Sequence, residues 1–155
     1  MKLRILPVAL VATLLLSCNE DETPAIDLEY PEIVVTENSF PVQCSIVERG
    51  DIMHFKAFFT DNAELGSYSL DIHHNFDHHT HSTEVNDCEM DAEKSPVNPW
   101  LLIDGFTIPA NQQSYTATMD LKIPEDVDIG DYHFMIKLTD KEGWQTIQGI
   151  SIQIE

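Results

Sequence analysis

The chain has 155 residues, of which 27 are acidic and 8 are basic, so its formal net charge at pH 7 is −19. A surface this acidic repels nucleic acids, which we therefore exclude as partners. The length fits one domain with a single hydrophobic core.

The first predicted element is a secretion signal at residues 1–17. Lys2 and Arg4 precede an apolar stretch, Ile5 to Leu16, that is too short for a membrane-spanning helix. The stretch ends in Leu15-Leu16-Ser17-Cys18, which resembles a bacterial lipobox. This resemblance implies cleavage before Cys18 and acylation of that cysteine, which would hold the domain on a lipid bilayer. An ordinary secreted protein is the alternative.

Residues 18–29 are predicted to form an acidic, flexible tether. The sequence Asn19-Glu20-Asp21-Glu22 looks like the surface-export signal of Bacteroidetes lipoproteins. We therefore expect an outer membrane lipoprotein that is either periplasmic or surface-exposed. Loss of Lys2 and Arg4 with the signal would change the net charge from −19 to −21.

Residues 30–155 predict an all-β domain, because apolar and polar residues alternate in short runs separated by turn residues. In the run from Asp51 to Thr60, one face carries Met53, Phe55, Ala57 and Phe59. The predicted strands are Ile33–Glu37, Asp51–Thr60, Gly66–His73, Ser114–Ile123, Asp131–Thr139 and Thr146–Ile154. About seven short antiparallel strands in a chain of this size indicate an immunoglobulin-like β-sandwich.

The end of the chain supports this fold class. Gly130-Asp131-Tyr132-His133-Phe134, followed by Asp140-Lys141-Glu142-Gly143, resembles the last hairpin of immunoglobulin-like and cadherin-like domains. Tyr132 has the position of a tyrosine corner in such domains.

A histidine cluster begins at the end of one predicted strand and enters the longest predicted loop. Five of the seven histidines lie within nine residues, in the run DIHHNFDHHTHS. Imidazole is the commonest protein ligand for zinc and copper. The candidate ligands are His73, His74, His78, His79, His81 and, from a neighbouring strand, His133. Asp71 and Asp77 are possible ligands or orienting partners, whereas His54 is expected on the other sheet, outside the site.

Two cysteines follow Cys18 and leave two interpretations open. An exported compartment permits a disulfide between Cys44 and Cys88. Cys88 lies seven residues after His81, however, so its thiolate is also a candidate ligand for zinc or cuprous copper.

The histidine run, placed after the pattern F-x-D-N-x-x-L-x-S-Y-S-L, looks like the signature of a Bacteroidetes lipoprotein family of unknown function. The resemblance covers the chain from about Tyr30 to its end. It implies an immunoglobulin-like β-sandwich at the cell envelope, and it implies no mechanism.

The main functional hypothesis is a lipoprotein that captures, senses or delivers zinc or copper. A metal-dependent hydrolase is a second hypothesis, but Glu84 is the nearest glutamate and no H-E-x-x-H spacing is present, so we expect no enzyme activity. An adhesion or carbohydrate-binding module without metal is a third, in which Trp100 and Trp144 would stack on sugars. A pH switch based on clustered imidazoles is a fourth. Converging imidazoles would favour the first hypothesis, and two exposed indoles on one face would favour the third.

Overall fold

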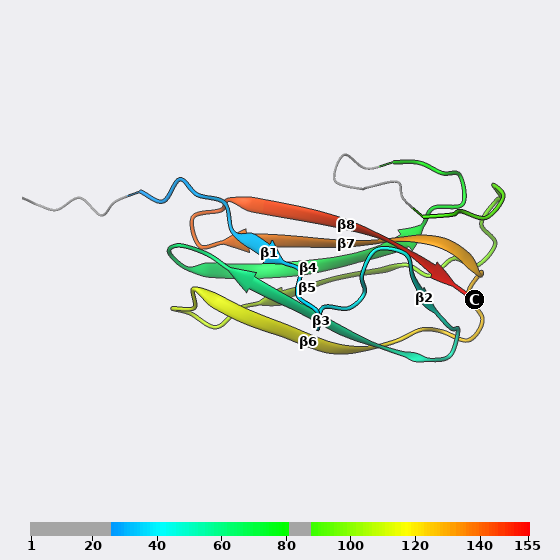
Figure 1. The fold of residues 1–155 in the computed structure, drawn as a ribbon, viewed down its shortest axis with the longest axis horizontal. Helices are drawn as coiled ribbons and strands as arrows, with labels where there is room; N and C mark the ends of the chain where they lie inside the picture. The colour runs from blue at the N-terminus through cyan, green and yellow to red at the C-terminus, as the bar shows by residue number, and fades with distance from the viewer. Residues whose placement is uncertain (1–25, 81–87) are drawn as a thin grey trace, which may run out of the picture.

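The computed structural model describes residues 26–80 and 88–155, which form eight strands in two sheets (Figure 1). The first sheet has the order β1-β3-β6 and the second has the order β2-β8-β7-β4-β5. The strands are β1 (Glu32–Val34), β2 (Ser45–Val47), β3 (Ile52–Thr60), β4 (Leu65–His74), β5 (Leu102–Thr107), β6 (Ser114–Lys122), β7 (Gly130–Asp140) and β8 (Gln145–Ile154).

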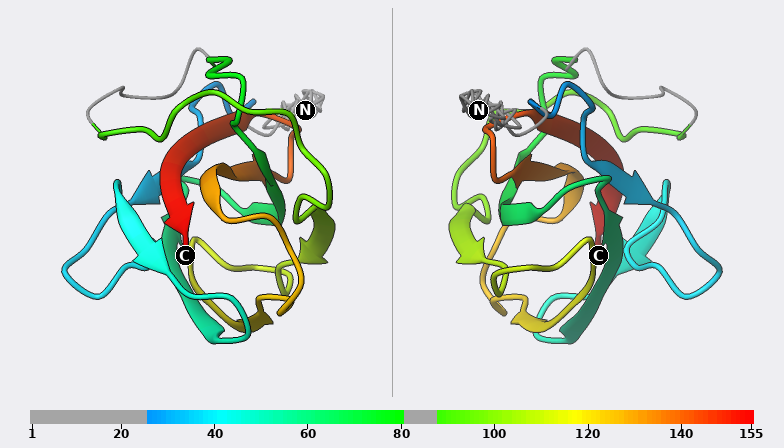
Figure 2. Two further views of the ribbon diagram at one scale, coloured as in Figure 1. Left: turned by 90° about the vertical axis from the view of Figure 1, so that its right-hand side faces the viewer. Right: turned by 90° about the vertical axis from the view of Figure 1, so that its left-hand side faces the viewer.

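The two sheets pack face to face as a β-sandwich, as the sequence predicts, and the end-on views show the two layers (Figure 2). Alternation along each strand places one set of side chains between the layers. Phe55 and Phe59 of β3 and Phe134 of β7 are at most 1% exposed. The rings of Phe55 and Phe134 lie 5.6 Å apart and join the two sheets at the centre of the core.

Two strands were absent from the prediction. β2 has only three residues and pairs in parallel with β8, so the second sheet is mixed and not purely antiparallel. β5 lies inside the segment that we expected to be one long loop, and it pairs with β4 at the edge of the sheet. Most of β5 is exposed and Gly105 interrupts it, so no apolar alternation reveals it.

The ends of the sandwich carry different features (Figure 1). At one end, β4 finishes and β7 begins, and residues 75–80 and 88–101 cover that end. At the other end, the turn between β7 and β8 lies beside the entering segment 26–31. Asp27 is buried there, and Trp144 donates from Nε1 to its carbonyl oxygen.

No helix in the part of the chain that the structure describes is long and apolar enough to cross a membrane. The predicted signal, Cys18 and the acidic residues after it lie outside the described residues.

Candidate metal site

Three histidines from three segments converge at the end of the sandwich where β4 finishes. His73 is at the end of β4, His133 is near the start of β7, and His79 belongs to the segment after β4. One ring nitrogen of each lies within 4.8 Å of those of the other two. The ring centroids are 4.8 to 5.6 Å apart. We call these three residues the histidine site.

Strand pairing places two of the three. β4 and β7 are antiparallel neighbours, as the sequence predicts, and their register puts His73 directly opposite His133. Side chains directly opposite on one face lie close together. Both residues point away from the sandwich core, because Ile72 and Phe134, their buried neighbours, point into it.

His133 is nevertheless 1% exposed, which the alternation pattern did not predict. The segment after β4 folds back over it, and Nε2 of His133 bonds to the carbonyl oxygen of His79 at 3.1 Å. This covering segment therefore buries His133, whose position on the strand would otherwise face solvent. It also brings the third imidazole to the other two.

Each imidazole of the site has one nitrogen bonded to an oxygen. Nδ1 of His73 lies 2.8 Å from Asp71 Oδ1, and Nδ1 of His79 lies 2.6 Å from Asp77 Oδ1. In metal sites, the ring nitrogen that does not bind the ion usually donates to a carboxylate or a backbone carbonyl. Asp71 and Asp77 thus have the geometry of orienting partners. The hydrogen bond to His79 also holds the pKa of the Asp77 carboxyl below its ordinary value.

The site fits a metal such as zinc or copper with small adjustments. Nitrogens around a tetrahedral zinc at 2.0–2.1 Å are about 3.4 Å apart, which is closer than the 4.8 Å limit within which the three ring nitrogens lie here. The side chains of His73 and His79 are 23% and 35% exposed, so both rings have room to move. His133, held by packing, would be the fixed ligand.

Of the other predicted histidine ligands, His74 and His78 are described, and neither belongs to the group of three. The ring of His74 packs 4.9 Å from Phe76 and lies 6.5 Å from the ring of His79, and its Nδ1 is buried with no hydrogen-bond partner within the described ranges. His78 turns away, with Nε2 at 2.9 Å from the carbonyl oxygen of Asp91. His81 lies outside the described residues.

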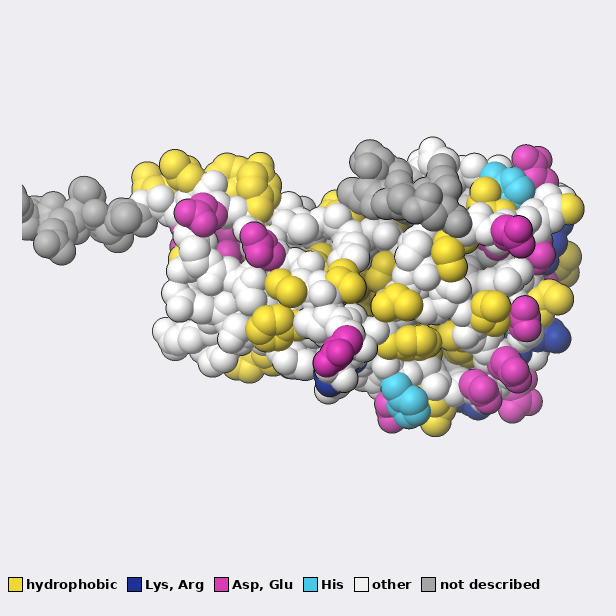
Figure 3. All heavy atoms as spheres, viewed as in Figure 1, with side chains coloured by type: hydrophobic (Ala, Val, Ile, Leu, Met, Phe, Trp, Pro, Cys, Tyr) yellow, Lys and Arg dark blue, Asp and Glu magenta, His cyan; other side chains and the backbone are white. Residues whose placement is uncertain are grey.

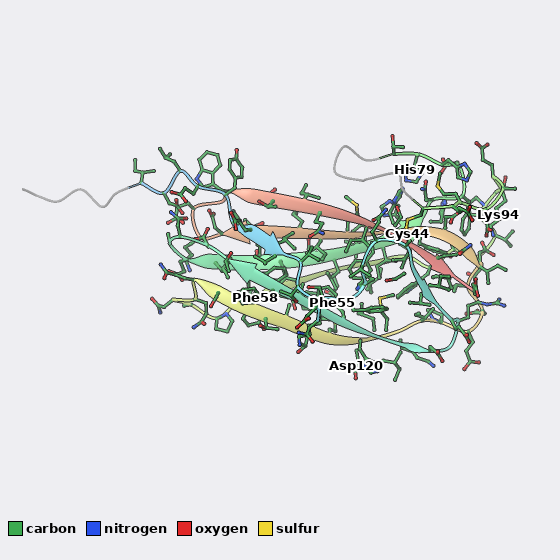
Figure 4. The ribbon with its side chains drawn as sticks, in the orientation of Figure 1. Cys44, Phe55, Phe58, His79, Lys94 and Asp120 are labelled. Carbon is green, nitrogen blue, oxygen red and sulfur yellow. A yellow bond between two sulfur atoms is a disulfide. The ribbon has the colours of Figure 1, made fainter. Side chains whose placement is uncertain are left out.

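His54 lies on the other sheet, as the sequence predicts. Its Nδ1 lies 2.7 Å from Oδ1 of Asp120 on β6, and both side chains are largely exposed. Figure 4 shows Asp120 and His79 on opposite layers, and Figure 3 shows histidine side chains at two separate places on the surface.

A disulfide joins Cys44 to Cys88, with 5.4 Å between their Cα atoms. Of the two interpretations that the sequence leaves open, this is the one that the structure shows. A bridged sulfur is no thiolate, so Cys88 is not a metal ligand while the bridge is intact. The bridge instead fixes the segment after the histidine run to the residue that precedes β2.

Asp128, on the loop before β7, and Asp131, the second residue of β7, hold the rest of the covering segment. Asp131 Oδ2 accepts from the backbone N–H of Asp91 at 2.8 Å. Asp128 Oδ2 accepts from the backbone N–H groups of Val97 and Asn98, both at 2.7 Å. These two residues were not singled out from the sequence. Their only signal there is a cluster of acidic residues before a strand, and such clusters are common in a chain with 27 acidic residues.

Tyr132 completes the attachment from inside the core. It is fully buried, and its hydroxyl donates to the carbonyl oxygen of Asp128 at 2.7 Å. The same hydroxyl accepts from the backbone N–H of Trp100 at 3.1 Å. A tyrosine bonded to the backbone a few residues upstream is the arrangement of a tyrosine corner. Burial raises the pKa of this phenol.

The comparisons with known proteins bear on the family. Residues 16–155 match the model of a family described as "Domain of unknown function (DUF4625)". The chain belongs to this family. No curated protein matches it.

One solved structure that resembles the chain is that of Spo0M, a sporulation control protein from Bacillus subtilis. The two are 11% identical, with a TM-score of 0.40, over 81% of this chain and 49% of the other. The chain thus spans about half the length of that protein. Neither the family nor this likeness assigns an activity.

Proposed function

We propose that this DUF4625 protein is a cell-envelope lipoprotein that binds zinc or copper through His73, His79 and His133, in metal capture, sensing or delivery. The observation that carries the proposal is the convergence of three imidazoles from separate segments within 4.8 Å. Imidazole sets suit both ions, and copper binds such sites more tightly at equilibrium.

The hydrogen bonds around the rings support a binding role. Each ring has a nitrogen bonded to a carboxylate or carbonyl oxygen, which is the kind of contact that orients a metal-binding imidazole. Three protein ligands leave a fourth position on a tetrahedral ion. That position would accept water, a further side chain such as His81, or a ligand from a partner that receives the metal.

The location at the envelope rests on the N-terminal sequence and on the disulfide. The apolar stretch before Cys18 and the lipobox-like residues favour export and acylation. A Cys44–Cys88 bridge persists in an oxidising compartment and is rare in the cytosol.

A hydrolase is less well supported than a binding protein. A catalytic zinc needs a nearby base, but both carboxylates closest to the site in sequence, Asp71 and Asp77, bond to imidazole nitrogens. The positions of the two tryptophans do not support the carbohydrate-binding hypothesis either. Trp100 is 6% exposed, and Trp144 bonds to Asp27 at the opposite end of the sandwich.

Metal binding to the untagged chain 23–155 tests the proposal. This fragment contains all eight strands and the whole described core, so we expect it to fold without the predicted signal. After dialysis against zinc or cupric ion, elemental analysis is expected to give one ion per chain at the histidine site. Calorimetry on His73→Ala and His79→Ala is expected to show affinities at least about 100-fold lower.

Matched controls are available on the same chain. His54→Ala removes an exposed histidine on the other sheet, and His78→Ala removes one from the same run that points elsewhere. Both should retain the wild-type affinity. If these controls lose affinity as much as the site variants, or if the wild type binds neither ion, the proposal is wrong.

A further inference from the structure

A second group of possible ligands lies at the opposite end of the sandwich. One carboxylate oxygen from each of Asp27, Asp140 and Glu142 lies within 4.8 Å of the other two. Asp140 ends β7, Glu142 belongs to the turn before β8, and Asp27 belongs to the segment that enters the domain. His133 and Asp140 are seven residues apart on one strand, which separates the two groups by roughly 23 Å.

Asp27 and Asp140 are deeply buried, and only one oxygen of each carboxylate accepts hydrogen bonds among the described residues. Asp140 and Asp27 are 4% and 9% exposed. Oδ1 of Asp140 accepts from the backbone N–H groups of Gly143 and Trp144, at 2.6 and 2.7 Å. Oδ1 of Asp27 accepts from the backbone N–H of Glu29 and from Asn62 Nδ2, at 3.0 and 2.8 Å.

The second oxygens of both aspartates have no such partners. Oδ2 of Asp27 and Oδ2 of Asp140 are buried and make no hydrogen bond within residues 26–80 and 88–155. A buried carboxylate oxygen without a hydrogen-bond partner costs free energy unless a cation or a donor faces it. The amide donors fix both carboxylates in place, so the unsatisfied oxygens are held ready for a ligand.

In the described part of the chain, no lysine or arginine forms an ion pair with the three acids. Lys141, their neighbour in sequence, pairs instead with Glu64 at 3.6 Å. The three carboxyl groups therefore lie together with no basic side chain paired to them among the described residues.

We infer that Asp27, Asp140 and Glu142 form a calcium site at the end of the sandwich that carries the β7–β8 turn. Calcium binds through oxygen ligands in flexible geometry, whereas zinc and copper favour the nitrogen donors of the histidine site. Magnesium demands a near-ideal octahedron, which a strand end, a turn and an entering segment do not readily provide. Glu142 is exposed, so its side chain can close over the ion.

The ion would join the entering segment to the last hairpin. This junction already includes the bond from Trp144 Nε1 to the Asp27 carbonyl oxygen and the contact of the Tyr30 and Trp144 rings, whose centroids are 5.0 Å apart. Calcium would add ionic ligation by Asp27 on one side and by Asp140 and Glu142 on the other. Calcium would thus strengthen the attachment of the entering segment 26–31 to this hairpin.

Terbium luminescence and thermal melting of the chain 23–155 test the inference. Tb³⁺ replaces calcium at oxygen sites and is excited by a nearby indole, so Trp144 would serve as the sensitiser. We expect one Tb³⁺ per chain, displaced by CaCl₂ with a dissociation constant of about 10⁻⁴ to 10⁻³ M. At 10 mM CaCl₂ the melting temperature should rise by about 5 °C or more, and by less in MgCl₂.

Single substitutions test whether calcium binds at these acidic residues. Glu142→Gln changes an exposed side chain and Asp140→Asn keeps the shape of a buried one, and each should weaken calcium at least about tenfold. Glu125→Gln, an exposed glutamate in the loop before β7, should behave as wild type. Trp144→Phe should abolish terbium luminescence while calcium still stabilises the protein.

The inference is overturned if calcium leaves the melting temperature unchanged. It is also overturned if Glu142→Gln retains the full calcium response, since that variant does not risk the fold. A response that disappears in His79→Ala but persists in Glu142→Gln would place the ion at the histidine site. The calcium experiment thus stands or fails independently of zinc and copper binding.

Discussion

Removal of the Cys44–Cys88 bridge is expected to destabilise the domain strongly. The two cysteines are 44 residues apart in sequence. In the chain-entropy model, a loop of this length corresponds to about 4 kcal/mol at 25 °C. For a domain of this size, 4 kcal/mol lowers the melting temperature by roughly 15 °C. The double variant Cys44→Ala/Cys88→Ala, followed by circular dichroism on heating, measures this loss.

The same variant should weaken metal binding. Without the bridge, the segment on the far side of the histidine run must be ordered when the ion binds, and each 1.4 kcal/mol of that cost lowers affinity about tenfold. Wild-type protein in reductant should match the double variant, which separates loss of the bridge from loss of the side chains. A fall in melting temperature of less than about 3 °C would refute the reasoning, because the covering segment would then be held by other contacts.

Three further outcomes are expected. Tyr132→Phe leaves the Asp128 carbonyl and a buried N–H without their hydroxyl partner, and denaturant unfolding should show a loss of about 1–3 kcal/mol. Asp77→Asn should lower zinc or copper affinity about 10- to 100-fold in calorimetry, with little change in melting temperature. Backbone hydrogen bonds from Val97 and Asn98 lower the pKa of Asp128, so its stabilisation is present at neutral pH and is lost on acidification. Asp128→Ala should therefore melt below wild type at pH 7, and the gap should narrow progressively as the pH falls below about 4; an equal gap at low and neutral pH would contradict this.

The fold was largely predictable because apolar and polar residues alternate along its long strands. Met53, Phe55, Ala57 and Phe59 occupy every second position of β3, and the structure buries all four. β2 and β5 escaped prediction for opposite reasons: β2 is too short to show a period, and β5 is an exposed edge strand. Their places in the sheet depend on backbone pairing with β8 and β4, which leaves no side-chain pattern.

The histidine site was also predictable only in part. The sequence identified the histidine run and predicted that His73 and His133 lie on neighbouring strands and face outward, whereas the register that sets them directly opposite each other comes from the structure. The sequence placed His79 and His78, which are adjacent in the chain, on opposite sides of an extended segment, but kept both as candidate ligands. The backbone conformation at His78, with φ of 53°, turns it to Asp91 and not to the other rings.

The sequence by itself determined the fold class, the acidic charge and the short list of imidazoles, because these depend on residue type and local spacing. Only the tertiary structure decided which three imidazoles meet, that His133 is buried beneath a returning segment, and that Cys88 is bridged. It also brought Asp27 to Asp140, residues 113 positions apart. The physical reason is that a loop without periodicity takes its path from long-range contacts, such as those of Asp128, Asp131 and Tyr132, and no local pattern encodes them.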